Sequence, residues 1–438
     1  MKGQFTDKQE PIRLIAVVLT AISSSLLIMG SGSAIASCAN VLISFFLLLF
    51  PESYIPLILA SSVSRSISIF GFSATYYYLF ILLIYVSIRS KFKFHIVFGK
   101  SSVLLLITLF CFFISSLLSE TGSTSVVIRL LLMIVLCYFC ASARIIRIDK
   151  SMYFIRETSL LILLVILAKM VFAPVPYIIE GARSSITLST VAADMNPNQI
   201  AQFIAVILFI SVASLRYKNK LVSIICIVIS IILLFLFKSR TSLYAALAIS
   251  SFYFLFVIGR AKPWCKILVL GLAASYVIFQ LFSAIQLAPA EALTYSEEKE
   301  VGVASIVTSG GSGRIFTWGE VIAYIIPEHP LLGIGIGIEN YEAYGLEHDC
   351  DNLYFDLLAG TGIIGFVFFF LFFISIIREI NDVDTTSSEI SKYLLLLLLC
   401  FGVGETVYDS FFMWSIVFLC LINLTSTSIP RESSIKAE

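Results

Sequence analysis

Hydrophobic residues fill long runs along nearly the whole chain, and short polar segments separate the runs. A run of about 17 to 25 apolar residues is long enough to cross a bilayer as a helix. The runs lie at residues 12–30, 34–50, 54–71, 74–88, 101–118, 125–142, 155–175, 196–215, 221–237, 242–259, 267–287, 352–377, 393–408 and 410–427. Pro56, Arg65 and Gly71 interrupt the third run. A re-entrant segment would explain that interruption, so the pattern predicts twelve to fourteen membrane-spanning helices.

One polar segment breaks this pattern, from residue 288 to residue 351. Loops of such length between ordered elements are usually functional or disordered. The segment divides the chain into three expected parts: transmembrane helices with short loops over residues 1–287, including an outer loop at 176–195, a large loop at 288–351, and C-terminal helices with a tail at 352–438. We expect the chemistry of the protein to involve the large loop.

The composition agrees with the pattern. Of the 438 residues, 59% are hydrophobic and only 13% are charged, and the mean hydropathy is +1.00. A soluble core would not use so much apolar surface. The sequence therefore predicts an all-α polytopic membrane protein whose first apolar run remains as an uncleaved anchor.

Basic residues gather in alternate polar segments, which predicts the orientation of the helices. Lys and Arg in short loops are retained on the cytoplasmic side. The clusters lie near residues 2–13, 89–100, 144–156, 216–220, 260–266, 378–392 and 431–436. This arrangement predicts that both termini are cytoplasmic and that the large loop faces outward.

Three arginines depart from this charge pattern, because three different outer segments each contain one. They are Arg183, Arg240 and Arg314. The guanidinium group makes paired, charge-assisted hydrogen bonds to phosphate and stays charged at any ordinary pH. We interpret the three as candidate anion ligands. The alternatives are a solvated loop charge for Arg183 and an interfacial side chain reaching lipid headgroups for Arg240.

The large loop is acidic, with eleven Asp and Glu residues against two cations, Lys299 and Arg314. This balance excludes a nucleic-acid surface and a phosphate site made by the loop alone. Apolar residues recur at helical spacing from Ile315 to Ile325 and predict a helix along the membrane surface as far as Pro327. Trp318 on that helix is expected to anchor it at the interface.

Glycines and polar residues follow that predicted helix. Gly333, Gly335 and Gly337 would let the backbone approach another segment closely. At the end of the loop, His348 is a candidate to bind or deprotonate a hydroxyl group. Asp351 and Asn352 stand at the start of the next helix, where either one would also serve as an N-cap.

Nothing in the sequence calls for a metal or an organic cofactor. The three histidines do not have the spacing of zinc ligands. The nine cysteines lie mostly within predicted spans, and Cys350 is the one in the large loop, so no disulfide framework is expected there.

The residues after Arg314 resemble the signature region of the O-antigen ligase and O-antigen polymerase superfamily. The resemblance rests on His329-Pro-Leu-Leu-Gly-Ile-Gly-Ile-Gly, on His348-Asp-Cys-Asp-Asn-Leu-Tyr, on Gly360, Gly362 and Gly365, on the outer loop from Gly181-Ala-Arg183 to Asn196-Pro-Asn198-Gln-Ile-Ala201, and on the Ser239-Arg240 turn. About 170 residues carry it. Each motif alone has low specificity, and the resemblance rests on their order and spacing together.

The resemblance implies a GT-C-like membrane glycosyltransferase in the bacterial inner membrane that needs no metal. Its substrate would be an oligosaccharide linked to undecaprenyl diphosphate, in contact with membrane lipids, and a chain-length regulator is a further expected partner. Positioned arginines would stabilise the departing diphosphate. The implied catalytic residues are His348, Asp351 and Arg314, and the implied substrate contacts are Arg183, Arg240, Asn352, Asn198 and Tyr354. Glu405 and Asp409 are further candidates for the base.

The chain departs from the family pattern at one point, because three residues separate His348 from Asn352. Ligases keep their histidine motif more strictly, so this departure favours a polymerase of lipid-linked repeat units over a ligase that transfers glycan to lipid A core. A lipid-linked glycan transporter is a third alternative, supported by Lys169 in the middle of a predicted span. No internal repeat supports the transporter.

Overall fold

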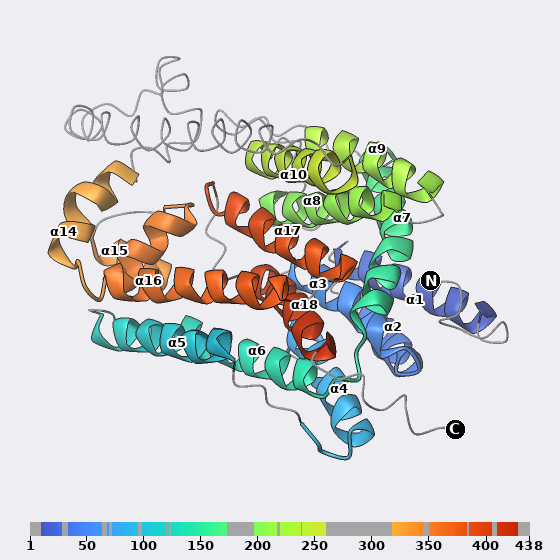
Figure 1. Ribbon diagram of the computed structural model, residues 1–438, viewed down its shortest axis with the longest axis horizontal. Coiled ribbons are helices and arrows are strands. Elements are labelled where there is room, and N and C mark those ends of the chain that lie inside the picture. The colour runs from blue at the N-terminus through green and yellow to red at the C-terminus, as the bar shows by residue number, and fades with distance from the viewer. Residues whose placement is uncertain are drawn as a thin grey trace.

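The computed structural model describes residues 10–28, 34–63, 68–69, 72–94, 99–119, 121, 124–172, 197–216, 220–237, 239–259, 318–344, 350–382, 385–404 and 410–427. Their architecture is a bundle of helices (Figure 1). The longer ones are α1 (Glu10–Ile28), α2 (Ala34–Leu47), α4 (Ala74–Arg89), α5 (Lys100–Leu118), α6 (Ser125–Ser142), α7 (Ile148–Phe172), α8 (Pro197–Ala213), α9 (Lys220–Leu236), α10 (Arg240–Tyr253), α16 (Leu353–Asn381), α17 (Thr386–Phe401) and α18 (Phe411–Thr427).

Within the described residues, seven helices are long and apolar enough to cross a membrane, and four shorter apolar helices accompany them. This finding confirms an all-α polytopic membrane protein. The apolar run at 267–287 lies outside the described residues, so the expected count of twelve to fourteen spans stays a prediction.

The run at 54–71 does not form one full-length helix. Helix α3 covers only Tyr54–Ser62, after a short 3₁₀ turn, η2, at Pro51–Ser53. Two short antiparallel strands, β1 (Ser68–Ile69) and β2 (Phe72–Ser73), then lead into α4. All nine residues of α3 are buried. Non-helical backbone at membrane depth is tolerated where protein surrounds it, so the re-entrant alternative is the better description of this segment.

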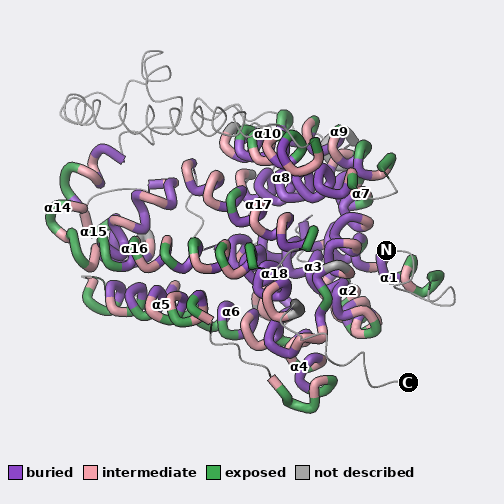
Figure 2. Tube along the Cα trace, in the orientation of Figure 1, coloured by how far each residue is buried: buried purple, intermediate pink, exposed green. Residues whose placement is uncertain are grey.

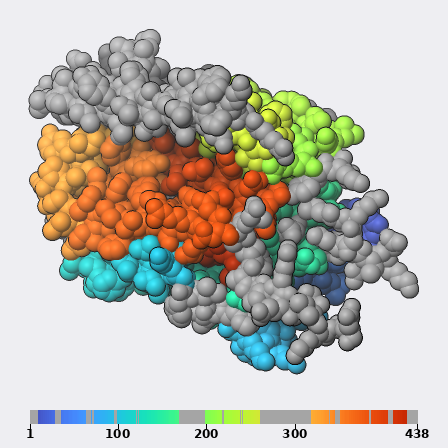
Figure 3. Space-filling view, viewed as in Figure 1, coloured from blue at the N-terminus to red at the C-terminus, as the bar shows by residue number. Residues whose placement is uncertain are grey.

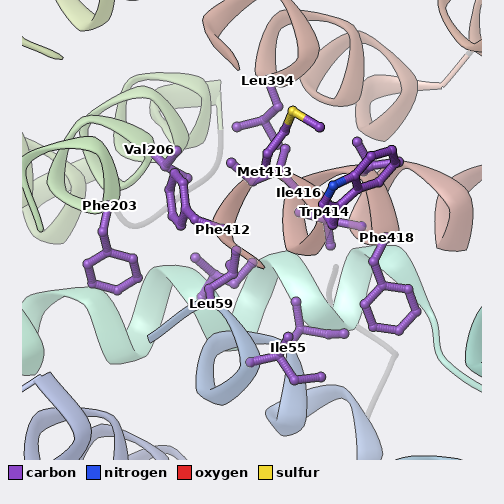
Figure 4. Close-up of a cluster of buried hydrophobic side chains, with 14 of the residues drawn as sticks. Ile55, Leu59, Phe203, Val206, Leu394, Phe412, Met413, Trp414, Ile416 and Phe418 are labelled. Carbon is purple, nitrogen blue, oxygen red and sulfur yellow. The ribbon is translucent and has the colours of Figure 1, made fainter. Parts of the chain in front are cut away.

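The bundle has an apolar core inside and apolar faces outside. Helix α8 is buried along nearly its whole length and packs against α9 and α10 (Figure 2). Core side chains from α3, α8, α17 and α18 meet around Trp414 and Phe412 (Figure 4). By contrast, Phe110 on α5 and Phe235 on α9 are exposed. Exposed large apolar side chains on helices such as α5 and α9 are what a lipid environment requires.

Basic residues gather at one end of the bundle, here called the basic end. Arg13 of α1 lies over the ring of Tyr153 of α7. Arg216, in a 3₁₀ turn, η4 (Ser214–Arg216), forms an ion pair of 2.6 Å with Glu389 at the start of α17. Arg216 also donates to the carbonyl oxygen of Val257, in a π-helical turn, η5 (Phe254–Ile258), that extends α10. Arg13 and Arg216 therefore hold helix ends together at this end, while the predicted orientation of the termini stays a prediction.

The opposite end, here called the loop end, carries the described part of the large loop. A π-helical turn, η6 (Val321–Ile325), continues into α14 (Ile326–Glu328), and a short helix, α15 (Ile338–Ala343), follows. Helix α16 begins beside them and runs along one face of the molecule next to α5 (Figure 3). Gly362 interrupts α16 with a backbone φ of 62°.

Candidate functional site

Several helices begin at the loop end, which makes this end favourable for negative charge. Arg216 ties the ends of α8 and of η5 to the start of α17 at the basic end, so the starts of α8 and α10 and the end of α17 lie at the other end. Helix α18 begins after the turn that follows α17. Each helix start carries a partial positive charge and backbone N–H groups without helical partners.

Asn352 is the N-cap of α16 and ties that helix to the turn after α17. Its side-chain oxygen accepts hydrogen bonds from the backbone N–H groups of Tyr354, at 2.9 Å, and Phe355, at 3.2 Å. Its amide nitrogen donates to the carbonyl oxygen of Val403 at 2.9 Å. The residue is 4% exposed. The capping alternative is thus confirmed, and the cap leaves the Asn352 oxygen occupied.

The same turn receives the first turn of α10. A Cβ atom at Gly404 would lie 2.3 Å from the hydroxyl oxygen of Thr241, so the Gly404 backbone touches the residue that follows Arg240. The backbone N–H of Leu353 also donates to the carbonyl oxygen of Gly402 at 2.8 Å. Turn 402–404 therefore brings together the helix that begins at Arg240 and the helix capped by Asn352.

The side chain of Tyr354, an expected substrate contact, makes contacts within the helix bundle. Its hydroxyl group donates to the carbonyl oxygen of Leu399 at 2.8 Å. Its ring stacks on Phe370 with 5.7 Å between centroids. These contacts hold α16 against α17, and we assign Tyr354 a structural role in place of the expected direct contact.

Asp351 has left-handed backbone geometry, with φ at 47°. Asp is one of the few residues with a side chain that tolerates this conformation. The side chain is partly exposed, in contrast to the fully buried Cys350 before it. Asp351 is therefore held in a fixed position at the start of α16 while part of its side chain stays accessible to a substrate.

Asp356 fixes that position and was not among the expected site residues. Its side-chain oxygen accepts from the Tyr341 hydroxyl group at 2.7 Å and from the Cys350 backbone N–H at 3.1 Å. Asp356 has no exposed surface. Its place one turn into an apolar helix is the sequence signal that could have identified it, because a carboxylate there needs partners.

The glycines of the large loop meet the break in α16, as their predicted role in close approach requires. The N–H groups of Ile334 and Gly335 donate to the carbonyl oxygens of Ala359 and Gly360 at 2.8 and 2.9 Å. In return, the N–H of Ile363 donates to the carbonyl oxygen of Pro330 at 2.9 Å. The loop backbone thus satisfies the polar groups that the kink in α16 leaves open.

Helix α5 holds the other side of this loop segment. The Ser115 hydroxyl group donates to the carbonyl oxygens of Leu332 and Gly360. The Ser116 hydroxyl oxygen accepts from the backbone N–H of Ile336 at 3.1 Å. Three segments far apart in sequence, α5, the glycine-rich turn and α16, therefore form one rigid unit at the loop end.

Trp318 differs from its expected role. It is buried, its indole N–H donates to the carbonyl oxygen of Cys350 at 2.7 Å, and its ring lies 5.4 Å from that of Phe355. It therefore packs the loop onto α16 instead of anchoring a helix at the interface. The expected helix is present from Trp318, and it extends past Pro327 to Glu328 because the π-helical turn shifts the hydrogen-bond pattern before the proline.

One carboxyl group in this segment has a shifted pKa. Burial raises the pKa of Glu320 above its ordinary value, because leaving water disfavours the charged form. Glu320 follows Trp318 closely, at the start of the turn that packs against α16.

Several expected site residues lie outside the described residues: Arg183, Arg314, His348, Glu405 and Asp409. For Arg240 the structure gives the start of α10, and the side chain lies outside the description. Asn198 is the second residue of α8, which begins at Pro197 as predicted. The side chain of Lys169, near the end of α7, is likewise outside the description.

A small cavity of about 40 Å³ lies between the end of α5 and the loop, lined by Ser119, His329, Asn340 and Tyr344 among others. Within the described parts of the chain, no group of three or more His, Cys, Asp or Glu side chains is arranged to hold a metal ion.

Comparison with known families adds one finding. Residues 225–370 match the family model Wzy_C, described as O-antigen ligase. The match begins in α9, includes the start of α10 and the large loop, and ends in α16. A comparison with curated proteins found no match.

Proposed function

From the match of residues 225–370 to the O-antigen ligase family model, we propose that the chain is a member of the O-antigen ligase and polymerase superfamily and acts as a polymerase of lipid-linked oligosaccharide repeat units. The growing glycan would move from polyprenyl diphosphate to the next lipid-linked repeat at the outer face of the bacterial inner membrane. The finding that carries the proposal is turn 402–404, where the helix beginning at Arg240 and the helix capped by Asn352 meet.

The reaction exchanges one bond at the first sugar of the donor. An acceptor hydroxyl oxygen bonds to the anomeric carbon, the bond from that carbon to the diphosphate oxygen breaks, and the electron pair leaves with the polyprenyl diphosphate. The hydroxyl proton passes to a base. We assign the base role to His348 or Asp351, with Glu405 and Asp409 as further candidates.

Charge stabilisation of the leaving diphosphate follows from the electrostatics of the loop end. Helices α8, α10, α16 and α18 present their starts there, and their dipoles favour an anion. We assign Arg183 and Arg314 to the diphosphate and Arg240 to a supporting contact, with Asn198 on the first turn of α8 as a further contact. Guanidinium groups with helix dipoles supply the stabilisation without a metal.

The runner-up is an O-antigen ligase, which would transfer a finished glycan to lipid A core. The matching family model is described as O-antigen ligase, and the match by itself is compatible with either activity. The separation of His348 from Asn352 favours the polymerase, because a ligase motif keeps the two closer. Both activities use the same donor chemistry and differ in the acceptor.

A deletion strain separates these functions. Loss of a polymerase leaves lipid A core carrying one repeat unit, whereas loss of a ligase leaves core without attached glycan, and these products differ on a gel. Arg183→Ala and Arg314→Ala, expressed at the normal level, should each fail to restore the ladder of long chains. Full ladders with both variants would refute the assigned diphosphate ligands, and an intact ladder in the deletion strain would refute the polymerase.

A further inference from the structure

The cavity at the end of α5 is separate from the contacts around turn 402–404. One wall is the end of α5 with the residue after it, Leu118 and Ser119. A second is His329 with the glycine-rich turn at Gly333 and Ile334. The third is α15 with the residue after it, from which Asn340, Ala343 and Tyr344 line the cavity. Three chain segments therefore enclose it.

Asn340 supplies an unused hydrogen-bond donor to this cavity. Its side-chain oxygen accepts from the Thr121 hydroxyl group at 2.5 Å, which fixes the orientation of the amide. Its amide nitrogen has no hydrogen-bond partner among the described parts of the chain, although the residue is only 2% exposed. A buried donor without a protein partner is costly, so an acceptor atom of a ligand in the cavity would satisfy it.

His329 and Tyr344 form the opposite wall. The Tyr344 hydroxyl group and the Nε2 atom of His329 are 2.5 Å apart and share a hydrogen bond. The pair presents an aromatic face and polar atoms of both kinds, because a hydroxyl group and an imidazole each can donate and accept. Ser119 adds a hydroxyl group whose proton is donated to the carbonyl oxygen of Ser116.

The described wall of the cavity formed by residues 318–344 offers no cation to a ligand. Residues 318–344 contain no Lys or Arg, and Glu328, Glu339 and Glu342 are exposed there. The lining supplies uncharged polar groups, the Asn340 amide, the Ser119 hydroxyl group and the His329–Tyr344 pair. An amide donor near an aromatic ring suits the hydroxyl groups of a neutral sugar.

The size of the cavity limits how much of a ligand enters. Its volume is about 40 Å³, and about 10–15 Å³ of such volume holds one water molecule. A few hydroxyl groups on one edge of a sugar ring therefore fit, while the rest of the ring stays at the rim beside Tyr344.

We propose that this cavity is a binding subsite for one neutral sugar of the glycan, with the Asn340 amide donating to a sugar hydroxyl oxygen and Tyr344 packing against the ring. This inference rests on the proposed function for the identity of the glycan. The sugar belongs either to the donor chain or to the acceptor repeat, and the two sources share the same chemistry.

Purified protein in lipid nanodiscs allows a test with two readouts. The first is binding of the lipid-free repeat-unit oligosaccharide, released from the host strain's own polysaccharide, followed by saturation-transfer NMR. The second is glycan transfer with the lipid-linked chain and the single lipid-linked repeat titrated separately. Asn340→Asp keeps the acceptor for Thr121 and removes the donor, and Tyr344→Phe removes the rim hydroxyl group.

Glu342→Gln is the matched control, because Glu342 is on the same short helix, is exposed and does not line the cavity. We expect Asn340→Asp to raise the KM for one of the two lipid-linked substrates at least tenfold, with kcat changed less than twofold, and to abolish oligosaccharide binding. Tyr344→Phe should raise the same KM by a smaller factor, and Glu342→Gln should leave it unchanged. The substrate whose KM rises identifies the source of the sugar.

Unchanged KM values in both cavity variants, or an equal rise in Glu342→Gln, would overturn the subsite, and so would oligosaccharide binding that persists in Asn340→Asp. Failure of the proposed function is recognised separately. It appears as an unaltered polysaccharide in the deletion strain, and the lipid-free oligosaccharide still tests the cavity in that case.

Discussion

The side-chain amide of Asn352 donates a hydrogen bond to the carbonyl oxygen of Val403 across 2.9 Å and joins two segments that are 51 residues apart in the chain. The same side chain caps α16 through its oxygen. One residue therefore performs two structural tasks that different substitutions can separate.

Asn352→Ser should retain most of the stability, because a Ser hydroxyl oxygen caps a helix about as well as an Asn amide oxygen, and should lose the bond to Val403. Asn352→Ala should lose both contacts, at about 1 kcal/mol for the cap and about 1 kcal/mol for the hydrogen bond. Thermal unfolding in nanodiscs measures the difference. Equal melting temperatures for the two variants would show that the cap does not contribute.

The contact of Gly333 and Gly362 with opposing backbone predicts a graded series of alanine variants. Both residues have positive φ, and a Cβ atom would lie 2.3 Å from the Ala359 oxygen at Gly333 and 2.2 Å from Leu331 at Gly362. Left-handed geometry costs a residue with a side chain about 1–2 kcal/mol, and overpacking adds about 1–3 kcal/mol. Gly333→Ala and Gly362→Ala should therefore reduce folded yield strongly.

Gly360→Ala is the control for this series. Its Cβ atom would lie 3.2 Å from the Gly335 oxygen, which a small backbone shift relieves. Folded yield, measured by size-exclusion chromatography in detergent, should be lowered less than in the other two variants. The opposite order would contradict the interlocked backbone described here.

Asp351 allows charge and backbone geometry to be tested apart. Asp351→Asn removes the charge and keeps a side chain that tolerates positive φ, whereas Asp351→Gly removes the side chain and relaxes the backbone. If Asp351 is the base, both variants should fold and lose glycan transfer by about 100-fold or more, the scale of general-base catalysis. Transfer by Asp351→Asn at the wild-type rate would leave the base role to His348, Glu405 or Asp409.

Glu320 predicts a dependence of stability on pH. Its pKa is raised in the folded protein, so the group favours the folded state below its unfolded pKa, and this contribution is lost as the pH rises through the folded pKa. Glu320→Gln should therefore melt at a higher temperature than the wild type near neutral pH and at the same temperature near pH 4.

Glu328→Gln removes the same charge from an exposed position and is the control for this comparison. Its melting temperature should follow that of the wild type across the range, because an exposed carboxylate loses no hydration on folding. A rise near neutral pH in both variants would indicate a general effect of net charge and contradict the burial of Glu320.

The sequence by itself determined the class of the protein and its charge pattern. Apolar runs of bilayer length leave only helices as a solution, since lipid cannot satisfy backbone polar groups. The interruption at Pro56 and Gly71 identified the one span that α3 replaces with a short buried helix. Motif order likewise predicted the superfamily whose ligase model matches residues 225–370.

Only the tertiary structure decided which polar residues have partners. The sequence predicted an interface contact for Trp318 and a substrate contact for Tyr354, yet both side chains donate hydrogen bonds to backbone carbonyl groups inside the fold. The sequence predicted no role for Asp356 or Asn340. Asp356 contacts Cys350 and Asn340 contacts Thr121, and both contacts depend on how the loop packs against α16 and α5. Spacing along a chain gives the face of a helix, whereas the partner of a buried polar group is set by segments that are distant in sequence and meet only in the folded protein.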